Sequence, residues 1–162
     1  MRLGAQELSS LLWKERELLE LLTFKLEEEQ LILTSGKTRW LQHATREVEQ
    51  VVERLRTAGL GRTVEVSALA REWGTEENAS LRDIAAQAPA GPWSEIFAGH
   101  LNALAELTTR IRELRDANDQ FLRAAARSTQ ETVAGLVPDA GTYNSRGGTG
   151  LDAGARLFDK DL

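Results

Sequence analysis

The residues best suited to acid–base chemistry are two carboxylates on an otherwise apolar helical stripe. Glu15 and Glu29 fall in line with Leu12, Leu19 and Leu26. Acid–base catalysis requires a carboxylate with a perturbed pKa inside a pocket, close to the bond that reacts. These two lie four helical turns apart, or ~21 Å, so they cannot act on one bond. The pattern instead predicts that each pairs with an Arg of a neighbouring helix and fixes the helix register.

The two histidines do not fit a metal site. A di-metal helical bundle carries Glu-x-x-His pairs, but Trp40 precedes His43 by three residues and Phe97 precedes His100 in the same way. The chain has no Cys, which excludes disulfides and thiolate zinc sites. The sequence therefore predicts no metal and no cofactor, with both histidines on the surface.

Nucleophilic and phosphate-transfer chemistry also lack a scaffold. A catalytic Ser needs a strained turn that holds it, and a phosphate loop needs a preceding strand. The Gly-rich run at 147–150 follows no predicted strand. We therefore expect no catalytic residue, and a protein that is not an enzyme.

Charge argues against nucleic acid as a partner. The 162 residues carry a net charge of -5 with both signs interspersed, whereas a nucleic-acid binder presents a basic stripe. The stretches at 70–74 and 80–84 superficially suggest a helix-turn-helix, but residues 62–91 hold three Arg against five acidic groups. That field would repel phosphate.

The start of the chain carries charges within its apolar run, which is not the pattern of a signal peptide. No stretch approaches the ~18 uncharged apolar residues of a membrane span. We therefore expect a cytoplasmic protein that does not insert into a membrane.

Apolar spacing predicts an all-α chain. Leu12, Leu19, Leu26 and Leu33 repeat every seven residues, the period of a coiled-coil seam. Breakers divide the predicted helices, with Gly36 after the first and Gly59 to Gly61 after the second. The predicted helices are 5–34, 37–58, 66–73, 80–87 and 93–136.

The expected fold is an elongated three-helix antiparallel bundle or coiled coil with a small helical insert capping one end. The bundle forms one domain over 1–137, and 138–162 is a flexible tail.

The longest predicted helix has a thin apolar face in its second half. It spans ~66 Å against ~45 Å for the first helix, so it should extend beyond its partners. An amphipathic face left uncovered is a groove for a partner helix. The candidate partner-binding residues are Asn118, Leu122, Ala125, Thr129, Val133 and Leu136.

The order of these parts resembles the FlgN family of flagellar export chaperones. The resemblance lies in LLWKERELLELL (11–22), LEEEQLIL (26–33), LRDANDQFL (114–122) and TYNSRGG (142–148). It implies a cytosolic type III export chaperone that holds the C-terminal segments of hook-associated proteins and delivers them to the export apparatus. Components of the export gate or of its ATPase are further candidate partners.

Two other functions remain open from the sequence. A structural coiled-coil adaptor would use the Leu12–Leu33 seam to dimerise, and would be a permanent homodimer. A helical secreted or effector-type protein of a bacterial export system would be found outside the cell.

Overall fold

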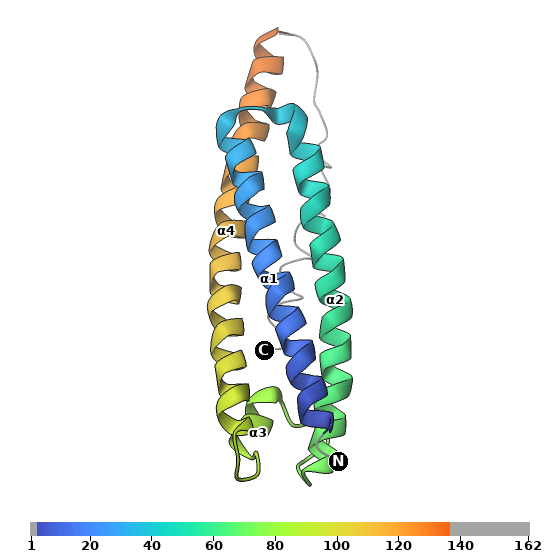
Figure 1. Ribbon diagram of the computed structural model, residues 1–162. Helices are drawn as coiled ribbons and strands as arrows, with labels where there is room; N and C mark the ends of the chain where they lie inside the picture. Colours follow the sequence, from blue (N-terminus) through green and yellow to red (C-terminus); the bar gives the residue numbers. More distant parts are fainter. Residues whose placement is uncertain (1–2, 137–162) are drawn as a thin grey trace.

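The computed structural model describes residues 3–136, and most of these residues are helical. The helices are α1 (Leu3–Ser35), α2 (Leu41–Glu72), α3 (Leu81–Ala86) and α4 (Trp93–Leu136), and a short 3-10 turn, η1 (Thr38–Trp40), precedes α2. No strand occurs among these residues. The three long helices form an elongated bundle, with α3 across one end (Figure 1). The predicted all-α bundle with a small helical insert is confirmed.

Helix α1 runs antiparallel to α2. Glu15 of α1 contacts Arg62, whereas Glu29, further along α1, contacts the earlier residue Thr45. The turn between the helices is tight because Gly36 adopts φ 74°, a left-handed conformation that glycine reaches without a steric penalty.

Helix α4 runs parallel to α1. Ser9 contacts His100 and Glu29 contacts Asn118. Residue numbers therefore increase in the same direction along both helices, with an offset of about 90. At that offset the end of α1 is level with about residue 125 of α4. The last 11 or so residues of α4 therefore extend ~16 Å beyond the turn on rise-per-residue arithmetic. Figure 1 shows this projecting end in orange.

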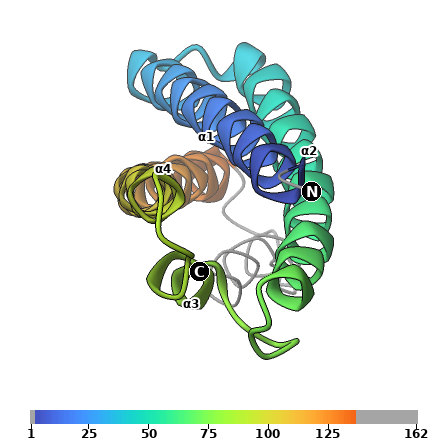
Figure 2. The same ribbon diagram turned by 60° about the horizontal axis from the view of Figure 1, so that its bottom comes forward.

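Helix α1 lies between the other two long helices and packs against both. Its buried side chains recur at alternating spacings of three and four, the periodicity of one helix face: Ala5, Leu8, Leu12, Glu15, Leu19, Leu22, Leu26 and Glu29. No Cα atom of α2 comes within 8 Å of a Cα atom of α4 in the described part of the chain. Figure 2, an oblique view with the α3 end in front, shows α1 between α2 and α4.

This arrangement bears on the coiled-coil adaptor hypothesis. Leu12, Leu19 and Leu26 are at most 4% exposed, because α2 and α4 already cover them. Most of the seam that an adaptor would use for dimerisation is thus part of the core of a single chain.

The predicted break at Gly59 to Gly61 is wrong. Helix α2 continues through both glycines to Glu72, so the expected separate helix at 66–73 falls on the C-terminal end of α2. A glycine inside a helix costs only about 1 kcal/mol relative to Ala. The flanking Leu55 and Leu69 keep one face in register against the core, and their burial outweighs that cost.

The chain reverses instead after Trp73, where Gly74 has φ 70°. Helix α3 begins with a capping box in which Ser80 and Asp83 bond each other's backbone amides. Trp73 and Trp93 both contact the fully buried Phe97, with ring centroids 6.0 and 5.6 Å away. These aromatic rings fill the core where α3 closes the bundle.

Helix α4 begins at Trp93 and ends at Leu136, as expected. The carbonyl of Pro92 accepts the first helical hydrogen bond, from the amide of Ile96. The expected tail at 138–162, and its boundary with the 1–137 domain, lie outside the described residues.

Candidate functional site

A groove of about 250 Å³ lies between α2 and α4, with α1 as its floor. Its apolar side chains come from all three long helices: Leu22, Leu26, Val48, Val52 and Leu122. Charged side chains also line it: Glu29, Glu49, Glu53, Arg56, Arg115 and Asp119. The groove exists because α2 and α4 each pack on α1 without meeting there.

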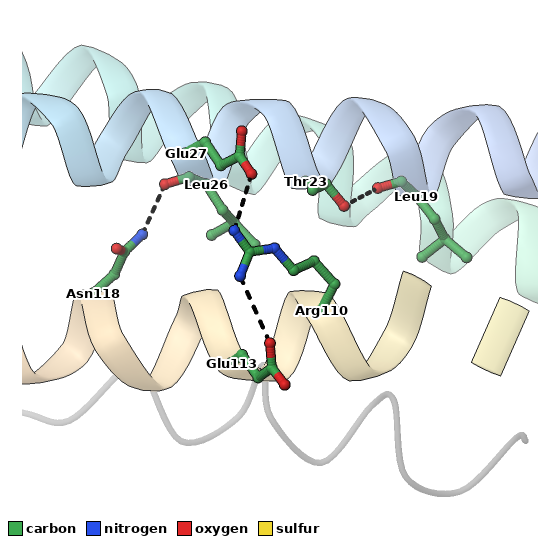
Figure 3. Close-up of polar contacts among 7 residues, drawn as sticks. All are labelled: Leu19, Thr23, Leu26, Glu27, Arg110, Glu113 and Asn118. Carbon is green, nitrogen blue, oxygen red and sulfur yellow. Dashed lines mark hydrogen bonds and ion pairs between the residues drawn. The ribbon is translucent and has the colours of Figure 1, made fainter. Parts of the chain in front are cut away.

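Three polar side chains meet at the groove, one from each long helix. The Asn118 Nδ2 group donates to the Leu26 carbonyl at 3.0 Å, shown in Figure 3, and to Glu29 Oε1 at 3.1 Å. The Thr45 hydroxyl donates to Glu29 Oε2 at 3.2 Å. We call Glu29, Thr45 and Asn118 the polar centre.

Burial raises the pKa of Glu29, because the charged carboxylate is removed from water. The hydrogen bonds from Thr45 and Asn118 oppose that rise, Asp119 adds to it, and the nearby charge of Arg115 opposes it. The expected Arg pairing is therefore only partly correct here. An Arg charge lies near, but neutral side chains make the hydrogen bonds identified above.

The Arg pairing predicted for Glu15 is confirmed. Glu15 Oε1 lies 3.2 Å from Arg62 Nη1, and both side chains are less than a tenth exposed. This pair joins α1 to α2 at a level of the bundle far from the polar centre.

The structure divides the six predicted partner-binding residues into three groups. Asn118 is 2% exposed and hydrogen-bonded inside the bundle, where it also lines the groove, and its contact with a partner stays a prediction. Leu122 and Ala125 are half-buried where the bundle ends, and Leu122 also lines the groove.

The other three predicted residues are exposed on the projecting end of α4. They are Thr129, Val133 and Leu136, and Val133 and Leu136 are 54% and 75% exposed. Because Leu122 belongs to both the groove and this face, the two form one continuous path along α4.

The prediction that both histidines lie on the surface is wrong for His100, which is 1% exposed. Its ring nitrogens lie 3.1 Å from the Ser9 hydroxyl and 3.3 Å from Arg16 Nη1. Burial, together with the Arg16 charge, lowers the pKa of His100. These contacts link α1 to α4 and leave His43 as the exposed histidine.

The contribution of α2 to the groove was not predicted. The signal was present, since Val48, Val51 and Val52 make the apolar stripe of α2 wider than one helix contact needs. Val51 is buried against the core, whereas Val48 and Val52 are half-buried and line the groove.

Within residues 3–136, no group of three His, Cys, Asp or Glu side chains is placed to hold a metal ion. The same stretch contains no helix that is long and apolar enough to cross a membrane.

The fold and the groove define an all-helical module with a surface suited to binding another protein segment. The family model for FlgN protein matches residues 1–150, and the chain belongs to this family of flagellar export chaperones. No curated protein matches the chain. No solved structure matches it.

Proposed function

We propose that this chain is a cytoplasmic chaperone for flagellar hook-associated proteins. It binds their C-terminal segments through the bundle domain at 1–137 and delivers them to the flagellar type III export apparatus. Membership of the FlgN family supports the export role in general. The observation that carries the proposal is the continuous apolar path from the groove to the projecting end of α4.

The shape and chemistry of this path favour a helical client segment. The groove offers leucine and valine side chains, and the projecting face offers small residues such as Ala125 and Thr129 that let a partner backbone approach closely. An amphipathic helix is the segment that buries its apolar face in such a groove. Delivery requires a second contact, with components of the export gate or of its ATPase.

A variant with two charges on the path tests this function. Leu122→Glu combined with Val133→Glu places carboxylates on a surface that must lose water when the client binds. We expect client affinity to fall about 100-fold or more, which is ~2.7 kcal/mol of binding free energy. The fold should persist, because Val133 is exposed and Leu122 is half-buried. Calorimetry with purified hook-associated proteins of the same organism measures the change.

The matched control is Phe24→Glu combined with Leu31→Glu. These side chains are 56% and 70% exposed on α1 and do not line the groove, so the same chemical change there should leave client binding intact. Unchanged binding by a folded Leu122→Glu, Val133→Glu variant would place the client site elsewhere on the bundle.

A further inference from the structure

The groove is not lined by apolar side chains alone, because a buried carboxylate and a buried amide lie among them. Glu29 is 5% exposed and Asn118 is 2% exposed, yet both line the groove beside leucine and valine side chains. Covering such groups with a wholly apolar helix would remove the remaining water from them without offering any hydrogen bond in return.

The hydrogen bonds within the polar centre leave unused acceptor positions rather than unused donors. Asn118 Nδ2 donates to two acceptors, Leu26 O and Glu29 Oε1, and this fixes the orientation of the amide. Its Oδ1 atom is buried and has no hydrogen-bond partner among the described residues. Each Glu29 oxygen receives one of the bonds described above, whereas an ionised carboxylate has about four acceptor positions.

The charges around the groove also favour a positively charged ligand. Four carboxylates line it, from Glu29, Glu49, Glu53 and Asp119, against the two guanidinium groups of Arg56 and Arg115. Arg56 is engaged by Glu53 at 2.7 Å. The groove therefore carries an excess of negative charge and attracts a cation.

We propose that the groove binds an amphipathic client helix whose apolar face carries one basic side chain, placed against Glu29 and Asn118. This inference rests on the proposed chaperone function and specifies the chemistry of its client. The aliphatic stem of a lysine would pack along the leucines of the groove, while its ammonium would supply the donors that the polar centre lacks.

The pairing makes binding depend on pH. Thr45 and Glu49 of α2 and Arg115 and Asp119 of α4 line the groove with Glu29. The raised pKa of Glu29 means that its carboxylate is neutralised at higher pH than an ordinary Glu. As the pH falls through that value, the groove loses its central charge, and affinity for the basic helix declines.

Two designed helical peptides of about 20 residues test the inference, because that length supports a helix in an Ala-rich sequence. They are identical except at the centre of the apolar face, which carries Lys in one and Leu in the other. We expect the full chain to bind the Lys peptide about tenfold more tightly at pH 7, the scale of one charge-assisted hydrogen bond. Glu29→Gln should abolish this preference.

The control variant is Glu27→Gln, which removes an exposed carboxylate of α1 that is paired with Arg110 and does not line the groove, and which should retain the preference. Circular dichroism verifies that both variants are folded. Equal binding of the two peptides, a preference for Leu, no binding of either peptide, or a preference that survives Glu29→Gln would overturn the inference.

Capture of the complete hook-associated proteins is measured in parallel. If the chain captures them without a preference for Lys in the peptides, the basic-residue inference fails and the chaperone function stands. If the chain captures none of them, the proposed function itself fails.

Discussion

Two glutamates on one face of α1 have different surroundings, although they occupy equivalent positions two heptads apart. Glu15 faces Arg62 of α2, and the pair is enclosed in the bundle. Glu29 faces Thr45 and Asn118 beside the groove, and burial raises its pKa. The opposing helices therefore decide whether a buried carboxylate is paired with a guanidinium group or held by neutral hydrogen-bond donors.

The largest loss of stability is expected when the ion pair between Glu15 and Arg62 is broken. Arg62→Ala leaves the buried carboxylate without its guanidinium partner, which typically lowers the free energy of unfolding by about 3 to 5 kcal/mol. Urea unfolding followed by circular dichroism measures the loss. A loss below about 1 kcal/mol would mean that the ion pair does not hold α1 and α2 together at Glu15. Glu15 would then no longer differ from Glu29 in its role.

A paired replacement serves as the control for that experiment. Glu15→Leu combined with Arg62→Met removes both charges and fills the space with apolar atoms. Such replacements are often neutral or stabilising. We therefore expect the double variant to unfold within about 1 kcal/mol of the original chain, or to be more stable.

The second prediction concerns the pH dependence at Glu29. Its folded pKa lies above the ordinary value of 4.5, so the folded state holds its proton more tightly than the unfolded chain. The resulting penalty is fully present above the folded pKa and disappears as the pH falls below the unfolded value. Glu29→Gln keeps an acceptor for Asn118 and removes this penalty, so its stability relative to the original chain should be higher at pH 7 than at pH 4.

Urea unfolding at both pH values measures this difference. Glu53→Gln, at a more exposed carboxylate, is the reference for general pH effects. If Glu29→Gln changed the free energy of unfolding equally at both pH values, the folded state would accept the charged and the neutral form of Glu29 equally well. Glu29 would then not differ from a glutamate that is paired with a cation.

The smallest loss of stability is expected for an exposed ion pair between α1 and α4. Arg110 bridges Glu27 of α1 at 3.2 Å and Glu113 of α4 at 3.6 Å (Figure 3), but its side chain is 52% exposed. Arg110→Ala should lower the free energy of unfolding by about 0.5 kcal/mol, since water already screens the pair. A loss comparable to that of Arg62→Ala would mean that burial does not explain the importance of Glu15.

The sequence was sufficient to predict two of the three long helices, α1 and α4, and the apolar face of α1. The heptad leucines of α1 and the left-handed turn at Gly36 follow from local rules, and the structure confirms them. The continuity of α2 through Gly59 and Gly61 could not be read locally, because burial of the flanking leucines on a distant helix decides it. Intrinsic helix propensity has little influence on where a helix ends when its amphipathic face packs against another helix.

The site was predicted only in part for a related reason. The projecting end of α4 follows from helix lengths alone, whereas the burial of Asn118 and His100 depends on the parallel register of α4 against α1. Local patterns do not specify that register. Asn118 occupies a core position because it can donate to Leu26 and to Glu29, and both acceptors lie on another helix.

The central position of α1 has a consequence for the order of folding. The hydrogen bonds and ion pairs described between α1 and α2 join residues 16 to 47 positions apart in the chain. Those described between α1 and α4 join residues 83 to 92 positions apart. Closing a longer loop costs more chain entropy and slows contact formation. The backbones of α2 and α4 do not approach each other closely. We therefore expect the α1–α2 hairpin to form first after the chain leaves the ribosome. Helix α4 should dock onto α1 as the last folding event.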